Sequence, residues 1–105
     1  MTTERTPGQW ISTYKKYVGW IAQEEENWET FAWEALIIRD YLAVRWARLS
    51  TSEQAVIYAT DEQLVQCHHQ LSQLLPGGGE HPRAQWWWYL HEGPQVREEA
   101  QRATV

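Results

Sequence analysis

The segment from residue 28 to residue 49, WETFAWEALIIRDYLAVRWARL, decides the fold. Apolar residues recur in it every three or four positions, which is the period of an α-helix with one face toward a core. We therefore expect a long amphipathic helix, Trp28–Leu49, at the centre of the protein. Its broad apolar face holds Trp28, Phe31, Ala35, Ile38, Leu42, Trp46 and Leu49.

A narrower apolar stripe lies on the otherwise polar side of the same helix. It consists of Trp33, Ile37 and Val44, which share one side at helical spacing. Two apolar stripes indicate two packing partners. Base rates favour a central helix with neighbours on both sides. The alternative is a core face plus an interface face, because charged residues such as Glu29 and Arg48 surround the stripe, as they surround protein interfaces.

A first helix is predicted from Pro7 to about Glu24. Thr6 is a favourable N-cap, and proline suits the first helical position. The acidic residues at positions 24–26 favour the start of a second helix, which predicts a break near there. The alternative is an unbroken helix to Leu49, roughly 64 Å long, which only a dimer could cover. The apolar arc of the first helix holds Trp10, Ile11, Tyr14, Tyr17, Val18 and Ile21.

Two capping-box patterns lie in the middle of the chain. Ser50–Glu53 predicts the start of a short helix that ends near Ala59, and Thr60–Gln63 predicts the start of another. The run Pro76–Gly79 ends this later helix, since proline and glycine both stop helices. One face of the later helix holds Leu64, Cys67, His68, Leu71, Leu74 and Leu75.

The last quarter of the chain contains three consecutive tryptophans, at positions 86–88. Pro82 can open a helix through them, and Gly93-Pro94 would end it. As a strand, the segment would turn alternate rings to opposite faces, but it lacks an evident partner strand, so we prefer a helix. On a helix the three rings point in three directions, and one face would not bury them all. Residues 1–6 and about 95–105 are predicted to be frayed or flexible.

These segments predict one domain over residues 1–105, an all-α bundle of four to five helices around Trp28–Leu49. The formal charge of -5 argues against a nucleic-acid partner, because phosphate contacts require a basic face. The charges within Trp28–Leu49 argue against a membrane span. The N-terminal residues are polar and predict no signal peptide. The single Cys67 suits a reducing compartment, so we expect a cytoplasmic location.

The sequence shows no recognisable catalytic motif, and we expect neither an enzyme nor a cofactor. Cys67-His68-His69 is the most metal-like group, but joint ligands on a helix need spacings of three or four residues. We therefore expect a packed Cys67, a core-edge His68, a solvent-exposed His69 and no metal. His81 and His91, with Glu80 and Glu92, would form a site only if their segment folds back.

The unusual feature of the composition is its 8 Trp and 5 Tyr, against 1 Phe. Large amphipathic rings are enriched at binding surfaces. The tryptophan cluster has three interpretations: it caps the core, it inserts into a partner protein, or it lines a site for a flat chromophore, sugar or base.

We therefore favour a non-enzymatic protein-interaction module with a protein partner, most simply a second copy in a homodimer. The alternative is a small-ligand or chromophore-binding protein that uses the tryptophans and His68 or His91. The predicted contact residues are Trp33, Ile37, Val44, Trp86, Trp87, Trp88 and Tyr89.

Overall fold

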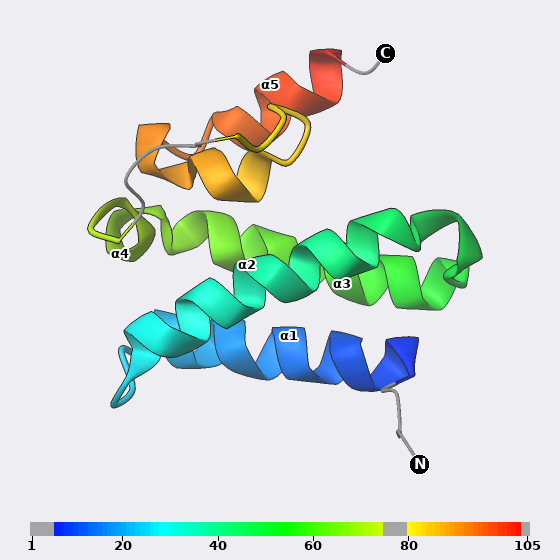
Figure 1. Ribbon diagram of the computed structural model, residues 1–105, viewed down its shortest axis with the longest axis horizontal. Helices are drawn as coiled ribbons and strands as arrows, with labels where there is room; N and C mark the ends of the chain where they lie inside the picture. Colours follow the sequence, from blue (N-terminus) through cyan, green and yellow to red (C-terminus); the bar gives the residue numbers. More distant parts are fainter. Residues whose placement is uncertain (1–5, 75–79, 104–105) are drawn as a thin grey trace.

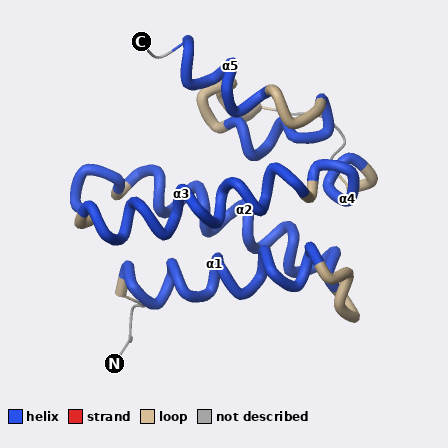
Figure 2. The backbone as a smooth tube through the Cα atoms, turned by 180° about the vertical axis from the view of Figure 1, so that it is seen from behind, coloured by secondary structure: helices blue, strands red, loops and turns tan. Residues whose placement is uncertain are grey.

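The computed structural model describes residues 6–74 and 80–103, and within them it confirms the predicted all-α fold. Figure 2 shows helices and loops in these ranges and no strand. The first three helices pack together: α1 (Pro7–Ala22) lies along α3 (Thr51–Gln66), and α2 (Trp28–Val44) crosses α1 (Figure 1).

The remaining elements connect these three helices or pack on them. A short 3₁₀-helix, η1 (Trp46–Arg48), follows α2, and α4 (His68–Ser72) follows α3. A second 3₁₀-helix, η2 (Trp86–Glu92), packs mainly against α4 and α5 (Val96–Ala103) and also touches α2 and α3 (Figure 1).

The predicted start of α1 is confirmed. Thr6 caps the helix through its hydroxyl, which accepts from the Gln9 N–H at 3.3 Å, and the Gln9 side chain accepts from the Thr6 N–H at 2.8 Å. The helix ends at Ala22, and the predicted break follows: Glu24 and Asn27 have φ angles of 51° and 65°. Left-handed backbone interrupts a right-handed helix, so the N-terminal half contains two helices rather than one.

The central helix is shorter than predicted, because α2 ends at Val44 and not at Leu49. The chain tightens into η1, and the Trp46 carbonyl accepts hydrogen bonds from the Leu49 N–H at 3.1 Å and from the Gln54 side chain at 2.9 Å. These bonds satisfy an acceptor that a longer α-helix would have used internally. The predicted core faces of the first two helices are confirmed in part: Ile11, Tyr14, Val18, Ile21, Ala35, Ile38, Leu42 and Leu49 are buried. The other predicted members are half-buried, namely Trp10, Tyr17, Trp28, Phe31 and Trp46.

The predicted break at Thr60 is wrong, because α3 runs unbroken from Thr51 to Gln66. The Ser50 capping box forms as predicted. At the second pattern, the Thr60 hydroxyl instead donates to the Val56 carbonyl at 2.9 Å, within the helix. Asp61 is buried beside it, so its carboxylate is used in the core rather than at a helix start. The helix breaks at Cys67, and Pro76–Gly79 lies outside the described residues.

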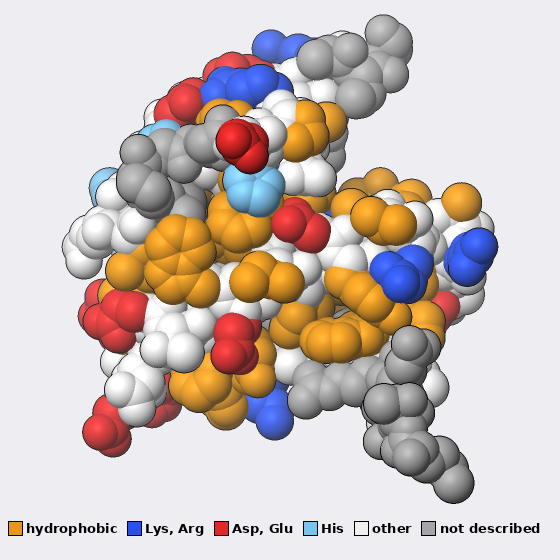
Figure 3. All heavy atoms as spheres, in the orientation of Figure 1, with side chains coloured by type: hydrophobic (Ala, Val, Ile, Leu, Met, Phe, Trp, Pro, Cys, Tyr) orange, Lys and Arg blue, Asp and Glu red, His pale blue; other side chains and the backbone are white. Residues whose placement is uncertain are grey.

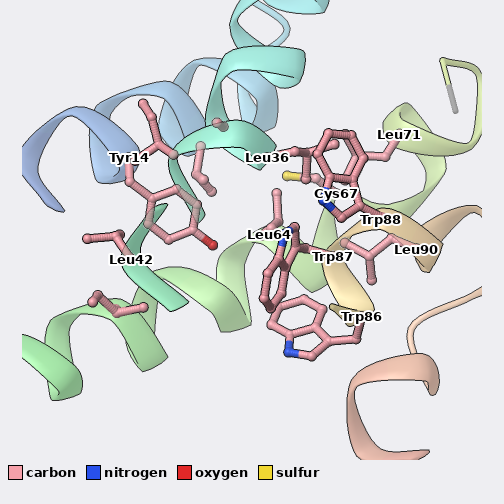
Figure 4. Close-up of a cluster of buried hydrophobic side chains, with 14 of the residues drawn as sticks. Tyr14, Leu36, Leu42, Leu64, Cys67, Leu71, Trp86, Trp87, Trp88 and Leu90 are labelled. Carbon is pink, nitrogen blue, oxygen red and sulfur yellow. The ribbon is translucent and has the colours of Figure 1, made fainter. Parts of the chain in front are cut away.

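The prediction that one face would leave some of the three tryptophans uncovered is wrong. Trp86, Trp87 and Trp88 are 5%, 3% and 6% exposed. A 3₁₀-helix has three residues per turn, so their rings do splay in different directions, as Figure 4 shows. All three are nevertheless buried because η2 has α2, α3, α4 and α5 around it. They therefore cap the core, which is the first of the three interpretations. Gly93, with a φ of 124°, ends the helix.

The C-terminal segment differs from the frayed helix or flexible tail predicted from about residue 95. Residues 96–103 form the helix α5, and its Val96 and Ala100 are buried. The sequence of α5 is strongly charged, and its apolar residues Val96 and Ala100 are four residues apart. Such spacing places both on one side of a helix, and that side packs on η2.

Candidate functional site

The narrower stripe of α2 faces outward. Trp33, Ile37 and Val44 are 38%, 58% and 79% exposed, so a second helical neighbour does not cover them within the described structure. The Trp33 ring packs against Trp88, with ring centroids 6.1 Å apart, which fixes the N-terminal end of the stripe. We call these three residues the α2 stripe. Its exposure contradicts the interpretation of α2 as a helix packed on both sides.

Charge is distributed unevenly along the helix that carries the α2 stripe. The exposed Glu29 and Glu34 lie in its N-terminal half, and Arg45 and Arg48 lie at or just beyond its C-terminal end. Figure 3 shows hydrophobic side chains gathered over α2, with acidic groups toward the N-terminal end and basic groups toward the C-terminal end. The surface therefore has an apolar centre between regions of opposite charge.

The tryptophan segment does not offer the exposed contact surface that its composition suggested. The indole N–H groups of Trp87 and Trp88 both donate to Asp40 Oδ1, at 2.6 and 2.8 Å. The half-buried Tyr89 donates its hydroxyl proton to the His81 carbonyl. Because these polar tips have partners inside the protein, the rings are held in place. Of the predicted contact residues, the α2 stripe alone is exposed.

A buried polar network joins the first three helices, and it was missed at the level of sequence. Asp61 of α3 accepts from Arg39 of α2 at both carboxylate oxygens, at 2.9 and 3.0 Å, and from the Tyr14 hydroxyl of α1 at 2.6 Å. The side chains of Arg39 and Asp61 are 6% and 1% exposed. Burial raises the pKa of Tyr14 well above its ordinary value of 10.0, and the Asp61 charge adds to the rise. Tyr14 thus keeps its proton as a donor.

The spacing of Arg39 and Asp61 carries a signal that could have revealed this network. Asp61 lies four residues after Ile57 and three before Leu64, and both of these side chains are buried. A charged residue at such a position belongs to the core face of its helix. Two such residues of opposite sign on two predicted helices indicate a buried pair, because an unpaired buried charge is strongly unfavourable.

The histidine and cysteine residues lie as the sequence predicted. Cys67 is buried, His68 is half-buried and His69 is exposed. Burial raises the pKa of the Cys67 thiol to about 11, which makes it a poor nucleophile near neutral pH. The segment around the tryptophans does fold back: the His81 ring stacks on the Trp88 ring, with ring centroids 4.0 Å apart. Among the described residues, no group of three or more His, Cys, Asp or Glu side chains is placed to hold a metal ion.

We expect Cys67→Ser and His68→Gln to leave the metal content of the purified protein unchanged, because neither belongs to a group of three or more His, Cys, Asp or Glu side chains that could hold an ion among the described residues, and a structural zinc ion usually has four ligands. Elemental analysis by mass spectrometry measures this, with His69→Gln as the exposed control. Stoichiometric zinc or iron that disappears in the Cys67 or His68 variant would contradict the prediction.

Compared with known protein families, characterised proteins and solved structures, the chain shows no match. Within the part of the chain that the structure describes, no helix combines the length and apolar character needed to cross a bilayer.

Proposed function

We propose that this chain is a non-enzymatic protein-interaction module, such as an adaptor, assembly factor or inhibitor of a larger complex, and that the α2 stripe is its contact surface. The observation that supports the proposal is the exposure of Trp33, Ile37 and Val44 on one side of α2. An apolar centre within a charged rim is the usual anatomy of an interface. A cytoplasmic location fits the unpaired Cys67.

The charge pattern favours a second copy of the chain as the occupant. If two α2 helices pack antiparallel across a two-fold axis, each acidic end meets a basic end. An antiparallel arrangement that places Trp33 against Val44 of the second copy brings the acidic end of α2, with Glu29, toward the end of the second copy that carries Arg45 and Arg48. A two-fold interface uses the same patch on both subunits, so a surface of this kind complements itself.

The size of the patch indicates a weak dimer. Three partly exposed side chains supply on the order of 300 Å² of apolar surface, which an ordinary monomer also tolerates. A stable complex needs about 800 Å² from each partner, so the polar flanks of α2 must be buried as well. The proposal therefore implies an association that depends on protein concentration and weakens with added salt.

We expect wild-type protein to shift from monomer to dimer as its concentration rises from micromolar to millimolar, and Ile37→Glu to stay monomeric. A carboxylate at the centre of the interface would be desolvated without a partner, which is strongly unfavourable. Light scattering over a concentration series, with circular dichroism to check helicity, measures both. Ser52→Glu, a charge added at an exposed position of α3, is the matched control.

A charge exchange tests the antiparallel register. Glu29→Lys and Arg48→Glu should each weaken the dimer, and the double variant should recover it, because the exchanged pair attracts again. A wild-type chain that remains monomeric at millimolar concentration would refute the homodimer. An association that survives Ile37→Glu would place the contact on another face.

A further inference from the structure

A cleft opens between the C-terminal end of α2 and α5, and the α2 stripe is not part of its lining. Its volume is about 410 Å³, within the range of small-molecule sites. Figure 3 shows the surface hollowed between the part that carries α5 and the end of α2. The residues that give the cleft its chemistry are Arg39, Trp46, Tyr58, Trp86 and Trp87.

The buried guanidinium of Arg39 forms part of the cleft wall with one edge unused. Its Nε and Nη2 donate to Asp61, but guanidinium groups carry donors on every nitrogen. Nη1 has no acceptor among the described residues, and it is not sealed from solvent. Because the side chain is only 6% exposed, this edge is reached through the cleft. A donor held in place by a salt bridge is already oriented for a ligand.

Aromatic rings surround this donor edge. The Arg39 Cζ atom lies 4.4 Å from the ring centroid of Trp87, 5.3 Å from that of Trp46 and 5.9 Å from that of Trp86. The Tyr58 ring packs edge-on against the Trp46 ring, with ring centroids 5.0 Å apart. Figure 4 shows Trp86 and Trp87 side by side at the lower end of the tryptophan cluster. Flat rings around a fixed guanidinium suit a planar ligand that stacks while it accepts hydrogen bonds.

A second cation lies behind the same aromatic wall. Arg97 of α5 packs over Trp86 and Tyr58, with its Cζ atom 5.4 and 5.9 Å from their ring centroids. It pairs with the exposed Glu62, and its Nε is buried without a hydrogen-bond partner in the described structure. Arg97 is not among the residues that line the cleft, so the guanidinium that a ligand would reach is that of Arg39, which favours an anionic acceptor over a neutral one.

We propose that this cleft binds a small planar molecule that carries a carboxylate. The carboxylate accepts from the Nη1 edge of Arg39, and the planar body packs against Trp46, Tyr58 and Trp86. Charge-assisted hydrogen bonds from a guanidinium fork give the site its preference for a carboxylate. The site is independent of the α2 stripe, so it does not require the proposed dimer.

The test uses 2-naphthoate as the probe and naphthalene-2-methanol as its uncharged counterpart. We expect 2-naphthoate to bind at submillimolar concentration and the alcohol to bind about tenfold more weakly, as loss of a charged hydrogen bond predicts. Titration calorimetry gives the affinities. In NMR spectra, the indole N–H signals of Trp46 and Trp86 should shift with 2-naphthoate, whereas that of Trp20, on α1, should not.

A pair of variants at the exposed Ala84, which also lines the cleft, tests the charge without disturbing the buried network. Ala84→Glu should weaken 2-naphthoate binding about tenfold relative to Ala84→Gln, since the two side chains have the same shape and differ in charge. Equal affinity for acid and alcohol, equal binding by the two variants, or no shift of the cleft indoles would overturn the proposal. Ile37→Glu should bind 2-naphthoate as the wild type does.

Discussion

Replacing Asp61 with alanine is expected to lower the free energy of unfolding by about 3–5 kcal/mol, because it leaves the Arg39 guanidinium buried without its counter-ion. The ion pair between Arg39 and Asp61 joins α2 to α3, with Arg39 Nε 2.9 Å from Asp61 Oδ1. Both side chains are almost fully buried. The substitution also removes the acceptor of the Tyr14 hydroxyl. Urea denaturation followed by circular dichroism measures the loss.

Two further variants separate the buried charge from ordinary polar contacts. Glu62→Ala, one residue along α3, breaks an ion pair whose carboxylate is 69% exposed, and it should cost less than about 1 kcal/mol. The double variant Arg39→Met, Asp61→Leu should be less destabilised than Asp61→Ala, because it removes both charges. If Asp61→Ala cost no more than Glu62→Ala, the pair would not be a buried one in solution.

Leu42→Ala and Leu71→Ala are each expected to lower the free energy of unfolding by about 2–5 kcal/mol, the range for cavities in packed cores. Both side chains are 0% exposed. Leu42 lies on the buried face of α2, and Leu71 of α4 lies close to Trp88 in the cluster of Figure 4. Chemical denaturation of each variant measures the change.

Val44→Ala provides the control for the core variants, since it removes an aliphatic side chain of α2 that is 79% exposed. It should change the free energy of unfolding by less than about 0.5 kcal/mol, as surface substitutions usually do. Losses near zero for Leu42→Ala or Leu71→Ala would show that these faces do not form the core.

The faces of α1 and α2 could be predicted because helical periodicity is a local property of the sequence. Periodicity shows which side of a helix is apolar, but it does not show how many neighbours surround it. For this reason periodicity placed Ile37 correctly on the outer side of α2. It did not predict that Trp86, Trp87 and Trp88 are all buried. The burial of these three rings depends on α2, α3, α4 and α5 together, and these elements are spread over residues 28–103.

The cleft lined by Arg39 could not be predicted from the sequence, for a related reason. Local pattern explained Asp61 as part of a capping box, whereas its partner Arg39 lies 22 residues away. The cleft also needs Trp46 from η1, Tyr58 from α3 and Trp86 from η2, and no short motif links these positions. The buried position of Asp61 could be inferred from its spacing, but its partner and the cleft become visible only when the packing of the helices is known.

The two hydrogen bonds that Asp40 accepts also have a consequence for the order in which the protein is built. Trp87 and Trp88 follow Asp40 by 47 and 48 residues, so a ribosome adds them roughly 2–10 s later. By the later part of that interval the nascent chain contains α2 and α3, but the indoles that cover Arg39 and donate to Asp40 have not been synthesised. This side of α2 is therefore covered only after η2 has been synthesised, and α5, which packs on η2, follows later still.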